Sequence, residues 1–465
     1  MPHAQDIRHA PRRSRSLPGA LGAVALAAIA WSFPGTSGTL YKCEGAEGIP
    51  SYVSQKMPGA KCTEIHYANA PRGNASTPAA ASVASSSTPS GVPGPTALPP
   101  LTTQRVGVID FGDPNAASAL SPLHVQGQRF HYVQLGDSHT AGDFMTGRLR
   151  ARLQARIGDG GAGWASPVRV SGQRLDSVGF EQSGWDLQSS RRGEPADYPA
   201  GGLIARPSGP RAELQLSVAT TGTPHRVTLL VQQQPMDAPL VVTDASGKRI
   251  IVASPVADGS WQAAEFVARL PLRMVAEAGP GTSIGGWWLS GQAPGALVSA
   301  IGINGSRLAQ RSRWRSGWLQ DLAPARPDVI ALAYGTNEAF DDTLDPEETR
   351  RDVASAVAQI RERFPAAAVL IIGAPESLIA TSGTCGVRAP SLDAVQRIQR
   401  EVAAAARTLY WDAQAAMGGR CSMKRWAGEA LARKDGVHFT SDGYARLGDA
   451  LYQGLVEPGA PGDAD

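Results

Sequence analysis

The sequence predicts an α/β fold, a parallel sheet flanked by helices, which an all-β module of jelly-roll or β-sandwich type interrupts. Mainly apolar runs such as residues 130–135 alternate with segments of helical period, as in parallel strands covered on both faces. Residues 165–298 instead show short alternating segments separated by Gly, Pro and Asp turns, which is typical of antiparallel sheets. A small module precedes both regions.

The elements follow in order along the chain. The strand at residues 130–135 leads through a tight turn into a helix with apolar positions at Phe144, Leu149, Leu153 and Ile157. After the β-rich stretch the α/β pattern returns. Its strands are expected within residues 296–306, 328–340, 366–377 and 409–417, and its helices within 347–364 and 391–408 and after Ser441.

The composition argues for folded cores joined by many loops. The chain has 465 residues, 42% of them hydrophobic, with 52 Gly and 35 Pro. Its 44 basic and 41 acidic residues give a net charge of only +3, so no nucleic-acid partner is expected. The length predicts several folded units.

The N-terminus indicates export. An arginine-rich opening precedes an uncharged apolar run at residues 17–33, which is either the core of a cleaved signal peptide or a short membrane tether. No small-residue lipobox precedes Cys43. The protein is therefore expected in the periplasm or outside the cell, anchored to the inner membrane if the run is retained.

The four cysteines form two pairs in sequence, Cys43 with Cys62 and Cys385 with Cys421. Disulfides suit an exported protein, and buried free thiols are the alternative. Neither a CxxC pair nor a Cys/His metal spacing occurs, so no metal is expected. No organic cofactor is expected either.

These features divide the chain into segments. An Ala, Ser and Pro-rich stretch that cannot build a core separates the small module from the rest. The expected order is a signal or anchor (1–38), a disulfide-pinned module (39–67), a flexible linker (68–105), a first α/β part (106–164), an inserted β-rich module (165–298), a second α/β part (299–456) and a disordered tail (457–465).

The first chemical motif is Gly136-Asp137-Ser138-His139, directly after a buried strand. A serine at a strand-to-helix turn presents its hydroxyl at the edge of the sheet, close to backbone N–H groups that can stabilise an oxyanion. Taken alone, Ser138 would more often be a helix cap than a nucleophile, while Asp137 and His139 are expected to shape the turn.

Two further motifs end predicted strands. Gly302-Ile303-Asn304-Gly305 offers a glycine amide that can approach a substrate carbonyl, and the segment from Gly335 to Glu338 contains Asn337, whose side-chain amide is a second neutral donor. Turn formation is the alternative role for Gly302 and Asn304.

The last motif is Asp435-Gly436-Val437-His438, just before the final helix. An offset of three residues on a turn lets the carboxylate hold one imidazole nitrogen while the other faces a serine. Taken alone, either residue could be an ordinary turn or surface residue.

In this order the four motifs resemble the blocks of the SGNH, or GDSL-like, hydrolases, over about residues 128–160 and 296–456. The resemblance implies Ser138 as nucleophile, His438 as base, Asp435 as its partner, and Ser138, Gly305 and Asn337 as oxyanion donors. Glu338 and His139 depart from the usual Asp and Leu. The residue sequences of the motifs and the presence of an inserted module are similar to the branch that contains peptidoglycan O-acetylesterases.

The resemblance implies an exported serine esterase acting on O-acyl, above all O-acetyl, esters of cell-wall or extracellular polysaccharide, with peptidoglycan first among them. Small esters, lipids and thioesters would need only another pocket. An envelope O-acetyltransferase and a silent polysaccharide-binding protein are the alternatives. In the module, Trp185, Trp261, Trp287 and Trp288 could stack on sugars, although core packing is the favoured role.

Overall fold

The computed structural model describes residues 37–44, 50–53, 61–68, 106–192, 195–209, 211–219, 222–277 and 282–458. The first three ranges form a three-stranded sheet of order β2-β1-β3, from β1 (Ser37–Glu44), β2 (Pro50–Val53) and β3 (Lys61–Ala68). The small module at residues 39–67 thus contains a β-sheet.

The expected parallel sheet is present, with strand order β17-β5-β18-β19-β22-β4. The first five strands run parallel to one another. The short edge strand β4 is antiparallel to β22, a departure from an all-parallel sheet. The strands are β4 (Ile109–Asp110), β5 (Phe130–Gly136), β17 (Ala296–Gly302), β18 (Val329–Ala333), β19 (Ala368–Ile372) and β22 (Leu409–Trp411).

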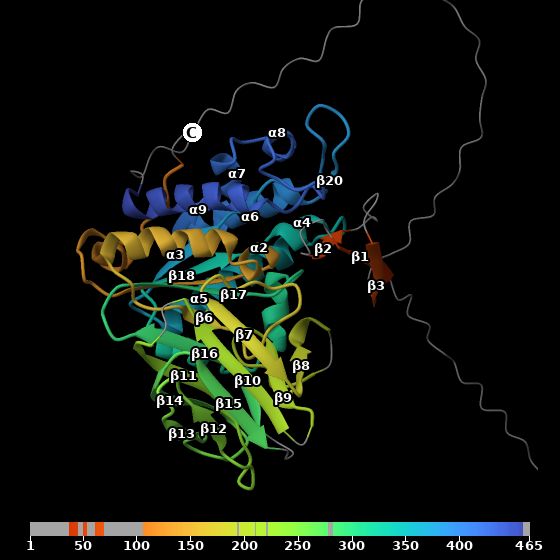
Figure 1. Ribbon diagram of the computed structural model, residues 1–465. Coiled ribbons are helices and arrows are strands. Elements are labelled where there is room, and N and C mark those ends of the chain that lie inside the picture. The colour runs from red at the N-terminus through yellow and green to blue at the C-terminus, as the bar shows by residue number, and fades with distance from the viewer. Residues whose placement is uncertain are drawn as a thin grey trace, which may run out of the picture. The chain divides into compact units, whose positions relative to one another are not determined.

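Helices cover both faces of this sheet, so its strands are apolar on both sides. One face packs under α3 (Phe144–Ile157) and α9 (Ser441–Val456), which lie side by side in Figure 1. The other face packs against α5 (Pro346–Arg363) and α6 (Leu392–Ala405). The shorter helices are α1 (Ala116–Leu120), α2 (Ser138–Ala141), α4 (Thr336–Ala339), α7 (Ala413–Ala416) and α8 (Ser422–Gly428).

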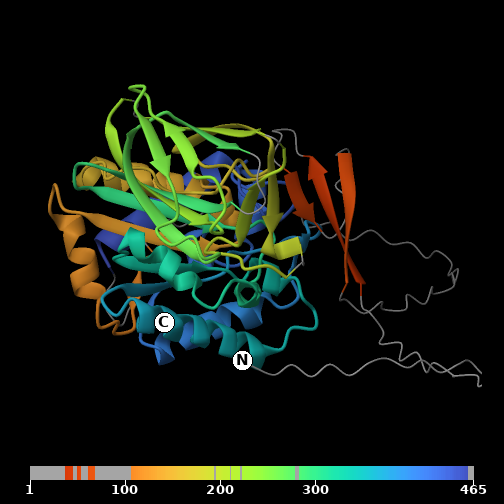
Figure 2. The same cartoon turned by 90° about the horizontal axis from the view of Figure 1, so that it is seen from below.

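The β-rich insertion is a sandwich of two antiparallel sheets, which appears in green on one side of the molecule in Figure 2. Both sheets contribute to one core that contains Leu214, Met274, Val227 and Trp287. One sheet has order β13-β12-β15-β10-β7 and the other β14-β11-β16-β9-β8, with β6 paired to β16. Their bounds are β6 (Gly163–Ala165), β7 (Val178–Ser183), β8 (Trp185–Ser189), β9 (Leu203–Pro207), β10 (Arg211–Val218), β11 (Pro224–Gln232), β12 (Leu240–Thr243), β13 (Arg249–Val252), β14 (Trp261–Arg269), β15 (Leu272–Glu277) and β16 (Ser283–Gly291).

The tryptophans of the module are mainly core residues. Trp261, Trp287 and Trp288 are all buried, and the indole of Trp288 donates to the backbone of Asp321 in the α/β part at 2.9 Å. Trp164 and Trp288 pack edge to face in a core that both parts share. The module is therefore joined to the α/β part by a continuous hydrophobic core.

Several expectations lie outside the described residues: the export signal with its apolar run at 17–33, the linker, and the side chains of Cys43 and Cys62. In the described ranges no helix is long and apolar enough to cross a bilayer.

Cys385 and Cys421 form a disulfide, as expected. Cys385 lies between the two strands of a small hairpin, β20 (Leu378–Ala380) and β21 (Val387–Arg388), and Cys421 precedes α8. Leu378 donates its N–H to the carbonyl of Gly436 at 2.8 Å. The disulfide thus holds a hairpin that braces the Asp435–His438 turn.

Replacing Cys385 and Cys421 together by serine should lower the free energy of unfolding. The bond closes a loop of 36 residues, for which loop-closure entropy predicts about 3 to 4 kcal/mol. Urea unfolding of the oxidised protein and of the double variant measures the difference. Equal midpoints and slopes would contradict the prediction.

Candidate active site

Ser138 lies where β5 ends and α2 begins, at the carboxyl edge of the parallel sheet. Asp137 caps this short helix, and its carboxylate accepts the N–H of His139 at 2.9 Å. Gly136 allows the turn, because a Cβ there would lie 2.1 Å from the Thr140 hydroxyl and 2.6 Å from the Ala333 carbonyl. The turn that contains Ser138 is therefore packed too closely for any side chain at that glycine.

The structure brings Ser138, His438 and Asp435 together in a hydrogen-bonded chain. Ser138 Oγ lies 2.9 Å from His438 Nε2, and His438 Nδ1 lies 2.9 Å from Asp435 Oδ2. An ionised carboxylate can only accept, so Nδ1 carries the proton and Nε2 is left to accept the serine hydroxyl. This arrangement activates a serine for attack on a carbonyl.

Asp435 is held in its ionised form. Burial alone would raise its pKa, but the charge of His438 and hydrogen bonds from His438 and from the N–H of Val437 lower the pKa to about 2. The side chain of Asp435 is fully buried, whereas that of His438 is 14% exposed. The carboxylate thus stays charged at every pH at which an esterase would work.

The other two predicted residues lie on neighbouring strand ends. Gly305 follows β17 and has φ of +70°, a conformation that favours glycine. Asn337 lies in α4 after β18 and donates its side-chain N–H to the carbonyl of Ser306 at 3.0 Å. An amide nitrogen has two N–H groups, so a second one can serve a substrate oxygen.

Replacing Asn337 by alanine should lower kcat about 10²- to 10³-fold with little change in KM, because the amide would act on charge that develops only in the transition state. Hydrolysis of an aryl acetate measures both constants. Asn115→Ala is a matched control, since its amide also donates to backbone carbonyls, those of Pro365 and Ala367. An equal loss in both variants would assign Asn337 a structural role only.

Behind Ser138 lies a buried polar group that the motifs did not reveal. His139 Nδ1 is 2.9 Å from the hydroxyl of Tyr444 on α9. Burial, and then the nearby His438, lower the pKa of His139 to about 3, so its ring is neutral. Asp137, His139 and Tyr444 line a cavity of about 30 Å³. Tyr444 belongs to no sequence motif. Its contact with His139 is therefore seen only in the structure, where α9 packs on the turn that contains Ser138.

Asp137 should make the protein less stable as the pH rises. Burial, opposed by the N–H of His139 and aided by the charge of Glu338, raises its pKa from 3.8 to about 7. Between these values the folded state holds a proton that the unfolded chain has lost, so the free energy of unfolding falls with increasing pH, by an amount on the order of a few kcal/mol. Urea unfolding of wild type and Asp137→Asn at both ends of this interval should show a steeper fall for wild type. Parallel pH profiles would refute this.

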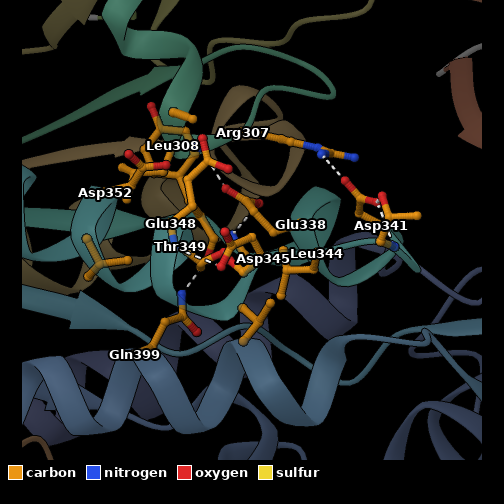
Figure 3. A pocket seen from close by; sticks show the side chains of 16 residues that line it. Arg307, Leu308, Glu338, Asp341, Leu344, Asp345, Glu348, Thr349, Asp352 and Gln399 are labelled. Atoms are coloured by element: carbon orange, nitrogen blue, oxygen red, sulfur yellow. Dashed lines mark hydrogen bonds and ion pairs between the residues drawn. The ribbon is translucent and has the colours of Figure 1, made fainter. Parts of the chain in front are cut away.

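Gly335 and Glu338, which belong to the same segment as Asn337, line a larger cavity of about 310 Å³ (Figure 3). Burial raises the pKa of Glu338, whose oxygens accept the N–H groups of Leu308 and Gly335. Arg307 forms an ion pair with Asp341 at 2.6 Å on the same wall. Glu338 thus takes the place of the usual aspartate and fixes two loops to each other.

Known proteins share this architecture. The model of the N-terminal part of peptidoglycan O-acetylesterases matches residues 160–273, and that of the GDSL-like lipase/acylhydrolase family matches residues 267–446. A solved peptidoglycan O-acetylesterase is 39% identical, over 75% of this chain and 97% of its own, with a TM-score of 0.68. No curated protein matches.

Two further solved structures are more distant. An acetyl xylan esterase is 15% identical over 34% of this chain and 79% of its own, with a TM-score of 0.27. A GDSL-like lipase from Bacteroides thetaiotaomicron is 21% identical over 34% of this chain and 75% of its own, with a TM-score of 0.25.

Fold and site define a serine esterase of the GDSL-like, or SGNH, type. The chain belongs to the peptidoglycan O-acetylesterase family, and the resemblance seen in its four motifs is confirmed. Sequence reasoning missed the contacts that Gln173 and Arg191 of the inserted module make with the loop of Gly305, because neither residue lies in a motif.

Proposed function

We propose that the protein is an exported esterase that removes O-acetyl groups from peptidoglycan, with Ser138, His438 and Asp435 as its catalytic residues. The observation that carries this proposal is the continuous hydrogen-bonded chain from Asp435 through His438 to Ser138, in a chain that is 39% identical to a peptidoglycan O-acetylesterase. The substrate class follows from that relative.

The reaction takes two steps. Ser138 Oγ attacks the acetyl carbonyl while His438 Nε2 takes the hydroxyl proton, and the same proton then passes to the leaving sugar oxygen. Water, deprotonated by His438, next attacks the acetyl-enzyme and releases acetate. The N–H groups of Ser138 and Gly305 and the amide of Asn337 are the proposed donors to the oxyanion.

The remaining segments have proposed roles in export, in tethering and in building the folded parts. Residues 1–38 would direct export, with the apolar run at 17–33 as a tether if it is retained, and residues 68–105 would be a flexible linker. Residues 165–298 would be the inserted module and residues 299–456 the second catalytic part.

Acetate release from O-acetylated peptidoglycan, from acetylated xylan and from a short aryl acetate tests the function. Peptidoglycan should give the highest kcat/KM, and addition of an acceptor glycan should not increase product formation. A preference for xylan would move the substrate to another polysaccharide. Acetate that appears only on an added acceptor would identify a transferase.

A further inference from the structure

The loop that contains Gly305, residues 302–306, is held in place by the inserted module. The carbonyl of Gly302 accepts the side-chain amide of Gln173 at 2.9 Å, and Asn304 donates its side-chain amide to the carbonyl of Gly172 at 2.7 Å. Both partners belong to one segment of the module. These two side-chain bonds, one in each direction, fix the start and the middle of the loop.

The same segment of the module, residues 172–176, also contacts the turn that contains Ser138. Arg174 donates its backbone N–H to the carbonyl of Ala141 at 3.2 Å, and Asp176 donates its N–H to the carboxylate of Asp143 at 2.8 Å. Ala141 ends the helix that begins at Ser138. Residues 172–176 therefore bridge the turn that contains Ser138 and the loop of Gly305, and support the direct bond between them, from the N–H of Ile303 to the carbonyl of Gly136 at 3.1 Å.

A second part of the module brings a positive charge to this loop. A Cβ placed on Gly305 would lie 2.7 to 2.9 Å from three guanidinium atoms of Arg191, so the guanidinium lies against that glycine. The neighbouring Ser190 is buried and accepts from the indole of Trp314 and from Arg313, each at 3.1 Å. Arg191 is thus held over Gly305 by an anchored segment.

We propose that the inserted module completes the oxyanion site, with Gln173 as a positioning residue for the loop of Gly305 and Arg191 as a fixed cation beside the developing negative charge. A cation held close to an oxyanion in a site with little water stabilises the transition state more than the ground state. The inference rests on the proposed function. It gives the module a role in the chemical step, in addition to any contact with the polysaccharide.

The test uses a small neutral aryl acetate, which is too short to reach a separate glycan-binding surface. Gln173→Met keeps the length of the side chain but removes its N–H, and Arg191→Gln removes the charge. Each should lower kcat about tenfold or more, leave KM nearly unchanged, and weaken inhibition by a trifluoromethyl ketone, whose adduct with serine has an oxyanion. Arg191→Lys should recover part of the loss.

Controls separate the possible failures. Arg226→Gln removes an exposed arginine from β11 of the same module and should behave as wild type. Thermal unfolding shows whether each variant folds, and the two sites are tested independently. Wild-type kcat in folded Gln173→Met and Arg191→Gln, or a rise only in the KM for polysaccharide, would overturn the inference. No Ser138-dependent hydrolysis in wild type would instead overturn the proposed function.

Discussion

Replacing Ser138 by alanine should abolish acetate release, with kcat lower by about four to six orders of magnitude. The hydroxyl is the only group of the protein that forms a covalent bond to the acetyl carbon in the proposed mechanism. Loss of a serine nucleophile leaves only the weaker contribution of the oxyanion donors and binding. Release of acetate from a short aryl acetate and from O-acetylated peptidoglycan measures the effect.

The variant should fold normally, because Ser138 Oγ contributes one hydrogen bond, to the partly exposed His438. We expect the free energy of unfolding to change by no more than about 1 kcal/mol. Ser118→Ala on α1 is a matched control, since that exposed hydroxyl bonds only to the carbonyl of Asn115. Activity in folded Ser138→Ala within tenfold of wild type would exclude the serine mechanism.

Much of the fold was predictable because each layer has its own periodicity. The strand that ends at Gly136 is buried along its whole length, so it lacks the alternation of apolar and exposed residues and has the mainly apolar character expected of a parallel sheet. In β10, buried positions alternate with less buried ones, as in one sheet of a sandwich. The edge strand β4 has two residues, too few for any period, so the sequence could not indicate its antiparallel pairing.

The site was predictable to the extent that its residues lie at strand ends. Ser138, Asn337 and His438 each belong to a motif whose local geometry follows from the turn that contains it. Gln173 and Arg191 differ, because their positions depend on how the sandwich packs against the catalytic part. Such contacts join residues more than a hundred positions apart and leave no pattern in a single sequence.

Replacing Asp435 by asparagine should lower kcat about 10⁴-fold while leaving the turn intact. The side-chain oxygen of the asparagine can still accept the N–H groups of Val437 and His438, which Asp435 Oδ1 accepts at 2.9 Å in the wild type. The new NH₂ group, however, faces His438 Nδ1 and can only donate. The imidazole must then carry its proton on Nε2, where it can no longer accept the proton of Ser138.

The variant should also lose stability, and the pH dependence separates this from catalysis. Asp435 has a pKa of about 2, below its ordinary 3.8, so it stabilises the folded state above about pH 4, by roughly 2 kcal/mol, and this contribution is lost as the pH falls toward 2.

Asp244 in the inserted module is a matched control for Asp435. Desolvation would raise its pKa, but hydrogen bonds from Ser246, Arg269 and Lys248 outweigh this and lower its pKa to about 2 as well. Asp244→Asn should therefore also lose acid-sensitive stability, with unchanged kcat. Only Asp435→Asn should lose both, and equal kcat in the two variants would show that Asp435 acts on the fold alone.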